Sequence, residues 1–413
     1  MPLIKPFAGL RPAPGRATEV AAPPYDVMNA AEARRMVQGR PWSFLHISRP
    51  EVDLPTTVDP LDDAVYAKAR ENLDRMLGEG VLVRDPSPYY YAYRLTMGGH
   101  CQTGLVASAS VAAYNAGRIR KHEFTRPVKE DDRVRQIDAL DAQTGPVFLV
   151  YRANSTIDDV LAATCAQAPQ VDITAADGVR HQLWVIADDA ACARLGAAFD
   201  ALDALYVADG HHRSAAAARI AAQRQASDPA AGPDAAHQYF LSVIFPHDQM
   251  QILPYNRVAR DLHGLDSEDF LRRVGVAFAI TPSDAPVQPA APADFGMYLD
   301  GRWYRLRLDP QRIPNHDPVG RLDVSLLQSN IIEPILGIVD PRRDERIDFV
   351  GGIRGLDGLT ARVDSGDMRI AFSLFATRMD ELMAVADAGE VMPPKSTWFE
   401  PKLADGLVSQ VIE

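Results

Sequence analysis

Cysteine is scarce in this sequence. Only three of the 413 residues are cysteines, Cys101, Cys165 and Cys192, and none is close enough to another in the sequence to form a typical metal-binding pair. One would be left over from any disulfide, and disulfides persist mainly in oxidising compartments. We therefore expect reduced thiols and a cytoplasmic protein. In its alanine-rich stretch, Cys192 is interpreted as a small packed side chain rather than a nucleophile.

Long apolar runs and an excess of positive charge are also lacking. The first residues, MPLIKPF, are broken by prolines, and no later stretch approaches the roughly 20 apolar residues of a membrane helix. Lysine and arginine total 43 against 55 aspartates and glutamates, and the net charge of -12 opposes binding to nucleic-acid phosphates. We expect no export, no membrane span and no nucleic-acid partner; the oligomeric state is left open.

The composition is that of a globular protein. Hydrophobic residues make up 47% and charged residues 24% of the chain, far from the profile of a disordered protein. A chain of this length forms either one large domain or two lobes. We predict a mixed α/β (α+β) fold with helices flanking a mixed sheet, over residues 1–413 as a single unit or as two interlocked lobes, about 1–155 and 156–413.

Hydrophobic periodicity places the main elements. Apolar residues at helical spacing predict a helix over 61–78 that ends near Gly78. The β-forming runs 89–97 and 103–111 flank Gly98 and Gly99, which predicts a hairpin. Further strands are predicted at 146–151, 182–187, 203–208, 239–245, 297–308, 347–351 and 369–375. The stretches 226–236 and 281–294 are rich in Pro, Ala and Asp and are predicted to be surface loops.

The sharpest local signal is LYVADGHHR at residues 205–213. An apolar strand runs into a polar turn, and an alanine-rich helix pattern follows it. Gly210 permits a sharp turn, and a helix start presents unpaired N–H groups and a positive dipole end to an anion. His211, His212 and Arg213 add hydrogen-bond donors there, so we predict that this turn binds phosphate.

Asp209, at the strand end, is predicted to hold Mg²⁺ or to take a proton from an attacking hydroxyl, the tasks of a carboxylate in phosphoryl transfer. The alternative is that Asp209 only caps the helix and the histidines are ordinary surface residues. We favour a site, because catalytic groups often lie on such turns. A transition-metal pair of His211 and His212 is less favoured, because sequence neighbours seldom bind one ion and no further His or Cys cluster is evident.

Charges of both signs crowd RKHEFTRPVKEDDRVR at residues 120–135. Its charged side chains could complete the site, but a solvated loop leading into a surface helix with weak ion pairs explains the pattern equally well. If the segment is functional, residues 122–133 should lie against the turn at 209–213. Each segment alone lacks the combination of cations and acids that phosphoryl transfer requires.

The segment MPPKSTWFEPK at residues 392–402 is rigid and aromatic for a stretch so near the end. Its prolines restrain Lys395, and we predict that Lys395 and Lys402 close over the site. The glycine framework of a Walker motif is missing, so that type of phosphate loop is excluded. Packing of Trp398 and Phe399 against the fold is an alternative role for the segment.

Taken together, several segments resemble the bacterial and archaeal family known as domain of unknown function 1015. They are KPFAGLRP, VAAPPYDVMN, PWSFLHISRPEVDL, KHEFTRPVKEDDR, TGPVFLVY, LYVADGHHR, DFVGGIRG and MPPKSTWFEPK, and they span Ile4 to about Leu407. The Asp-Gly-His-His-Arg turn is also similar to the turn of ParB-like and sulfiredoxin-like folds, including free serine kinases. In those folds the element binds nucleotide phosphates beside the transferred phosphoryl group.

The second resemblance covers only Asp209 to Arg213, with Asp26 matching an acidic position near the start of those folds. ParB proteins add a DNA-binding helical region that is not visible in this acidic sequence. Sulfiredoxin needs a cysteine at the turn, where this chain has His211. The resemblance therefore implies kinase-like chemistry rather than DNA partition or sulfinic-acid repair.

We predict a nucleotide-dependent phosphotransferase acting on a small hydroxyl compound, with free L-serine as the leading acceptor and O-phosphoserine as the product. ATP or ADP is the expected donor and Mg²⁺ the expected cofactor. A metal-dependent phosphohydrolase and a nucleotide-binding regulator without turnover are the alternatives. The predicted site residues are Asp209, His211, His212 and Glu123 for catalysis, Gly210, Arg213, Arg126, Lys129 and Lys395 for nucleotide phosphates, Asp209 and Asp132 for the metal, and Asp26 and Lys402 in support.

Overall fold

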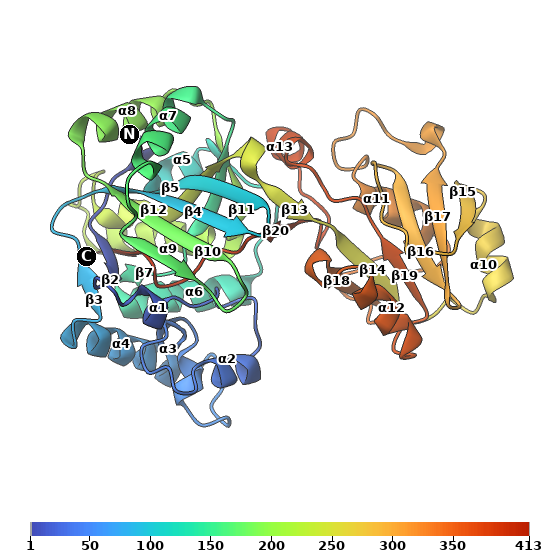
Figure 1. The fold of residues 1–413 in the computed structure, drawn as a ribbon, viewed down its shortest axis with the longest axis horizontal. Coiled ribbons are helices and arrows are strands. Elements are labelled where there is room, and N and C mark those ends of the chain that lie inside the picture. The colour runs from blue at the N-terminus through green and yellow to red at the C-terminus, as the bar shows by residue number, and fades with distance from the viewer. Residues whose placement is uncertain (1, 413) are drawn as a thin grey trace. The chain divides into compact units, whose positions relative to one another are not determined.

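The computed structural model describes residues 2–412, which form two compact units. The first unit runs to Met250 and takes up the chain again at Pro401, and the second is Gln251–Glu400. The lobe boundary expected near residue 155 does not coincide with this division. It would separate β8 (Val147–Tyr151) from its sheet neighbour β11 (Leu205–Asp209). The mixed α/β class is confirmed (Figure 1).

A mixed sheet forms the centre of the first unit; it has nine strands within residues 2–412. Eight of them follow the order β6-β11-β8-β12-β5-β4-β10-β9, and β1 pairs with β5. β6 runs parallel to β11 and β12 parallel to β8, whereas the other pairs are antiparallel. The remaining bounds are β1 (Ile4–Lys5), β4 (Tyr90–Met97), β5 (His100–Ser110), β6 (Ile119–Arg120), β9 (Val171–Thr174), β10 (Arg180–Ile186) and β12 (Tyr239–Pro246).

Helices cover one face of this sheet. Alternate strand residues such as Leu105, Leu149 and Val207 share one buried cluster with apolar residues of the covering helices, as the period of two in a strand requires. Another helix, α6 (Pro127–Leu140), packs on one of them through Val134 and Ile137. The covering helices are α5 (Val111–Asn115), α7 (Ser155–Cys165), α8 (Asp189–Asp200) and α9 (His211–Ser227).

The opposite face carries the C-terminal segment of the chain. The Ser108 hydroxyl donates to the Gln410 side chain, and the backbones of Ala22 and Asp405 pair, so segments from both ends of the chain meet here. A small antiparallel sheet of order β3-β2-β21-β7 joins them; its strands are β2 (Gly9–Pro12), β3 (Leu82–Arg84), β7 (Ala142–Gln143) and β21 (Ser409–Val411). The helices α1 (Ala17–Val20), α2 (Ala30–Met36), α3 (Leu45–Ser48) and α4 (Asp63–Gly78) add a separate apolar cluster.

The second unit is built on an antiparallel sheet of order β15-β17-β16-β19-β14-β18. These strands are β14 (Tyr255–Ala259), β15 (Phe278–Ser283), β16 (Asp294–Leu299), β17 (Arg302–Leu308), β18 (Ile347–Gly351) and β19 (Ile370–Ser373). A separate pair is β13 (Gln251–Leu253) with β20 (Trp398–Glu400), and the helices are α10 (Ser267–Val274), α11 (Asp323–Leu327), α12 (Asp357–Asp364) and α13 (Met379–Asp387).

Most of the predicted elements are confirmed. The hairpin turns at Gly98 and Gly99 between β4 and β5, and α4 occupies the predicted helix within two residues. Two predictions need correction. The single strand at 297–308 is a hairpin, β16 and β17, that turns at Asp300 and Gly301, both with positive φ. Residues 281–283 are not loop but the end of edge strand β15, where a proline is tolerated.

Two further expectations from the sequence concern membrane helices and cysteines. No helix within residues 2–412 has both the length and the apolar character needed to cross a membrane. All three cysteines are free, and Cys165 and Cys192 pack against the apolar cluster under the helices. The interpretation of Cys192 as a packed side chain fits this position.

Candidate active site

The turn after β11 positions the candidate site. β11 ends at Asp209, Gly210 adopts a left-handed conformation with φ of 97°, and α9 begins at His211. A side chain at position 210 would be strained by this φ, and its Cβ would come within 3.0 Å of the Arg213 Nε. Gly210 therefore allows the guanidinium to lie directly against the turn.

Arg213 is buried and fixed by its surroundings; only 8% of the residue is exposed. One terminal nitrogen donates to the Pro146 carbonyl, and the other lies 3.6 Å from an Asp209 oxygen and 4.0 Å from an Asp26 oxygen. Burial alone would lower the pKa of this guanidinium, but the charges of Asp209 and Asp26 outweigh burial and raise it. Arg213 is thus a permanent, preoriented positive charge at the start of α9.

Asp209 lies between two cations. Its side chain is 36% exposed, with Lys402 Nζ at 3.7 Å and Arg213 at 3.6 Å, and it accepts a hydrogen bond from the Gly210 N–H at 2.8 Å. Burial would raise the pKa of this carboxyl, but Lys402, Arg213 and the neighbouring His211 together hold it well below its ordinary value. Asp209 therefore stays ionised throughout the physiological range.

The histidines of the turn contact the predicted second segment. The His212 Nε2 accepts a hydrogen bond from the Arg126 backbone N–H at 3.0 Å. The buried ring of His211 meets that of His122 edge to face, with 4.5 Å between centroids, and its Nδ1 lies 3.5 Å from a Glu123 carboxylate oxygen. Burial, followed by neighbouring positive groups, lowers the pKa of both His211 and His212, so both rings are neutral at pH 7.

These contacts confirm the predicted proximity of residues 122–133 to the turn. α6 packs along α9, and Arg219 in the middle of α9 pairs with Glu130 and Asp131 near the start of α6. Arg126 and Lys129 are exposed, and their charges act on His212 after the larger effect of burial. The placement of this segment is therefore settled, whereas the roles predicted for Arg126 and Lys129 remain predictions.

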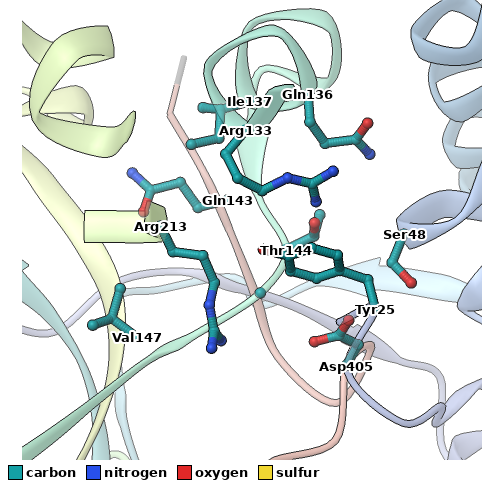
Figure 2. Close-up of a pocket in the computed structure, with 11 residues that line it drawn as sticks. Tyr25, Ser48, Arg133, Gln136, Ile137, Gln143, Thr144, Val147, Arg213 and Asp405 are labelled. Atoms are coloured by element: carbon teal, nitrogen blue, oxygen red, sulfur yellow. The ribbon is translucent and has the colours of Figure 1, made fainter. Parts of the chain in front are cut away.

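A polar cavity lies on the other side of Arg213. The cavity is small and partly open to solvent. In Figure 2 the Arg133 guanidinium lies over the Tyr25 ring, 4.0 Å from its centre, while the Arg213 guanidinium and the Asp405 carboxylate lie lower in the view. The lining residues are Tyr25, Ser48, Arg133, Gln136, Ile137, Gln143, Thr144, Gly145, Val147, Arg213 and Asp405. Such a mixture of cations, hydroxyls and one carboxylate suits a small charged ligand.

Asp405 is the unusual group of this cavity. The residue is 1% exposed, and neither carboxylate oxygen has a hydrogen-bond partner of normal geometry among the described residues. Burial raises the pKa of Asp405 to about 7, despite the opposing charge of Arg213 and a weaker interaction with the Tyr25 main chain. A buried, unsatisfied carboxyl is costly, which makes Asp405 a candidate to bind a positively charged ligand group.

Two of the predicted site residues, Asp132 and Lys395, contact residues outside the turn at 209–213. Asp132 accepts hydrogen bonds from Arg133 on one oxygen and from the Tyr66 hydroxyl on the other. Its predicted role as a ligand of Mg²⁺ together with Asp209 remains a prediction. Lys395 belongs to the second unit, where its Nζ lies 5.4 Å from the centre of the Tyr255 ring, and its assignment to the phosphate site remains a prediction.

In the second unit the aromatic segment packs as the alternative interpretation proposed. Trp398 meets the Tyr255 ring edge to face with 5.2 Å between centroids, and Gly351 leaves room for the indole. Buried Arg257 donates to the carbonyls of Pro394 and Lys395. These contacts give residues 392–400 a structural role.

A comparison with known protein families identifies the family to which the chain belongs. A family model described as protein of unknown function DUF1015 matches residues 4–325, most of the sequence. The chain belongs to this family. The resemblance drawn from the sequence segments is therefore confirmed, and a search of curated proteins finds no match to this DUF1015 protein.

Solved structures similar to this DUF1015 protein share little sequence with it. A conserved hypothetical protein from Pyrococcus furiosus is 13% identical with a TM-score of 0.34, covering 75% of this chain and 95% of its own. A free serine kinase in complex with AMP is 13% identical with a TM-score of 0.33, covering 75% and 92%. SbnI from Staphylococcus aureus, with a C-terminal truncation, is 12% identical with a TM-score of 0.38, covering 74% and 87%. Values this low identify no activity, so function must rest on the site itself.

Several residues of the candidate site were not predicted from the sequence. Asp405 follows the motif that was singled out at 392–402, and its Ala-Asp-Gly context is typical of an ordinary turn. Tyr25 and Arg133 lie in recognised segments but carried no assigned role. They belong to the site because they line a cavity together with Arg213. No local sequence pattern predicts that cavity.

Proposed function

We propose that this protein is a nucleotide-dependent phosphotransferase that acts on a small hydroxyl compound, with free L-serine as the leading acceptor. The observation that carries the proposal is the polar cavity beside the Asp209 turn, which Arg133, Arg213 and Asp405 line. It combines fixed positive charge for phosphate or carboxylate groups with a buried acid for an ammonium group.

The turn supplies the phosphate site in this proposal. The first N–H groups of α9 have no side-chain cap, and Arg213 adds a permanent charge within the first turn of the helix. Backbone N–H groups and a guanidinium together bind phosphate oxygens by charge-assisted hydrogen bonds. The sequence resemblance of residues 209–213 to free serine kinases favours a nucleotide as the donor.

Asp209 suits the binding of a cation better than the acceptance of a proton. Its pKa is depressed, and a carboxylate with low proton affinity is a weak general base. Its exposed edge would hold the Mg²⁺ that accompanies a nucleotide, since Mg²⁺ is typically bound by one or two carboxylates, phosphates and water. Mg²⁺ would neutralise charge on the phosphates.

The acceptor side of the cavity matches a zwitterion. A guanidinium binds a carboxylate in a bidentate manner, and Asp405 lacks a partner that an ammonium group would supply. The hydroxyls of Tyr25 and Thr144 line the same space. L-serine carries all three complementary groups, a carboxylate, an ammonium and the hydroxyl that becomes phosphorylated.

Acceptor-dependent nucleotide consumption tests the proposal. The protein is incubated with Mg²⁺, ATP or ADP, and a pool of amino acids and polyols, and phosphorylated products are identified by mass spectrometry. Loss of product in Asp209→Asn, with product retained in the control Arg180→Gln, would support it; Arg180 pairs with exposed Asp172 on β9. Phosphate release without an acceptor would favour a phosphohydrolase instead. Thermal stabilisation by nucleotide without turnover would favour a regulator.

A further inference from the structure

Three residues with metal-binding side chains meet at the edge of the sheet beside the turn. His122, Glu123 and His211 each offer one donor atom, and these atoms lie within 4.8 Å of one another. His122 and Glu123 follow β6, whereas His211 begins α9 directly after β11. Because β6 and β11 are parallel neighbours, both chain segments leave the sheet at the same edge. The fold itself therefore assembles the cluster across 89 residues of sequence.

The spacing of these atoms is more typical of metal ligands than of hydrogen-bonded groups. The His211 Nδ1 and the Glu123 oxygen are 3.5 Å apart, whereas a charge-assisted hydrogen bond is about 2.7–2.9 Å long. Two ligands each about 2.1 Å from one ion lie roughly 3–4 Å apart. The donor atoms that are farthest apart, at up to 4.8 Å, lie just beyond this range. The Glu123 side chain is 52% exposed, so a small movement of its carboxylate would bring it close enough.

His122 is oriented for coordination before any ion arrives. The residue is 3% exposed, and its Nδ1 has no hydrogen-bond partner among the described residues. The ring also forms a hydrogen bond with the main chain of Val207, which leaves the lone pair of Nδ1 available. Metal-binding histidines usually make such a bond through their second nitrogen. A buried nitrogen without a partner is costly, and a bound ion would satisfy it.

We propose that His122, Glu123 and His211 form a binding site for one divalent transition-metal ion of the Zn²⁺, Mn²⁺ or Co²⁺ type. Two imidazoles and one carboxylate suit these ions better than Mg²⁺ or Ca²⁺, which prefer oxygen ligands. Three protein ligands leave further positions open for water or a phosphate oxygen. The negative charge of Asp209 acts on both imidazoles and counters the positive charge of Arg213 beside His211.

Coordination has one local cost. In the absence of an ion, the His211 Nε2 accepts a long contact of 3.5 Å from the His122 backbone N–H, which places the ring proton on Nδ1. Binding a metal through Nδ1 moves that proton to Nε2, so the contact has to lengthen. At 3.5 Å the contact is already at the limit of a hydrogen bond, and its loss is small beside the gain from a metal–ligand bond.

Cobalt titration tests this site without reference to enzymatic turnover. The full chain is freed of metal with a chelator and titrated with Co²⁺, while the visible d–d absorption and the bound metal per chain are measured. One ion per chain is expected, with Zn²⁺ displacing Co²⁺ and excess Mg²⁺ failing to do so. Glu123→Gln and His122→Gln should each weaken Co²⁺ binding by at least roughly tenfold, because even second-shell changes cost 10–100-fold.

The control variant is His212→Gln, which removes an adjacent histidine whose Nε2 is occupied by the Arg126 N–H and should leave Co²⁺ affinity unchanged. Circular dichroism reports whether each variant folds. If the variant at the buried position, His122→Gln, misfolds, the variant at the exposed position, Glu123→Gln, still tests the proposal. Wild-type protein that binds no Co²⁺, or binds it as tightly as Glu123→Gln, overturns the proposal. No nucleotide or serine is present, so this result and the test of phosphotransfer are independent.

Discussion

Asp405→Asn should stabilise the first unit, and by more as the pH rises. The carboxyl has a pKa of about 7 in the folded protein against 3.8 in its unperturbed state. Between these values the unfolded chain releases the proton while the folded chain keeps it, so stability falls as the pH rises and levels off above about 7. The difference of about 3 units corresponds to about 4 kcal/mol. Asparagine retains the shape and cannot ionise.

The size of the effect follows from this linkage. Relative to wild type, the variant should gain roughly 2 kcal/mol in the free energy of unfolding at pH 5 and roughly 4 kcal/mol at pH 8. Any fixed cost of placing an amide in the cavity affects both values equally. The quantity to be tested is therefore the increase of roughly 2 kcal/mol between the two pH values.

Urea unfolding at pH 5, 6, 7 and 8 measures this increase; tryptophan fluorescence reports on Trp42 and Trp184 in the first unit once Trp303 and Trp398 of the second unit are replaced by phenylalanine. Asp172→Asn is the matched control. The exposed Asp172 carboxyl has a lowered pKa through its hydrogen bonds to Arg180, so its loss gives no gain that grows above pH 5. A pH-independent difference between Asp405→Asn and wild type would refute the assignment of a buried, proton-retaining carboxyl.

Four further outcomes are expected at the same site. Asp209→Asn should lower turnover by at least roughly a hundredfold with folding intact; unchanged turnover would remove Asp209 from the mechanism. Arg213→Ala should weaken nucleotide binding about tenfold to a hundredfold, measured by calorimetry, because charge-assisted hydrogen bonds are lost; equal affinity would contradict this. Gly210→Ala should cost about 1–2 kcal/mol of stability for its left-handed backbone alone, and a neutral result by urea unfolding would exclude that strain. Serine affinity should rise with pH through about 7 as Asp405 ionises, and a flat profile of KM would exclude an ammonium contact.

The turn could be predicted because its signals are local. An apolar run, a glycine and an alanine-rich helix pattern follow one another within 205–222, and these features alone determine a strand, a sharp turn and a helix start. The hairpin around Gly98 and Gly99 was predictable for the same reason. Both are confirmed: the hairpin and helix α9 form hydrogen bonds between residues near in sequence, although strand β11 itself pairs with the distant β8 and β6.

The metal cluster and the cavity could not be predicted in this way. His122 meets His211 because β6 pairs with β11, but β6 consists of only Ile119 and Arg120, too short for any period to reveal it. Asp405 reaches the cavity through backbone pairing with Ala22, almost the whole chain away. Such long-range pairings depend on the packed fold, and burial is what turns an ordinary Ala-Asp-Gly turn into an unsatisfied carboxyl.

The division into units was missed for a related reason. Residues 401–412 return to the first unit after the second is complete, so the first unit is discontinuous in sequence. Composition and linker signals mark boundaries between successive segments and do not show where a chain returns. The return places Lys402 within 3.7 Å of Asp209, whereas Lys395, only seven residues earlier, belongs to the second unit.

Phosphorus NMR of one reaction mixture tests the central claim most directly. Protein, Mg²⁺, nucleotide and L-serine are combined, and the fate of the terminal phosphoryl group is followed. Transfer to serine is expected, seen as a phosphomonoester signal coupled to the serine methylene protons that grows as the terminal nucleotide phosphate disappears, and that is absent with Asp209→Asn. Appearance of inorganic phosphate alone, or an unchanged nucleotide spectrum at every acceptor concentration, would contradict phosphotransfer to serine.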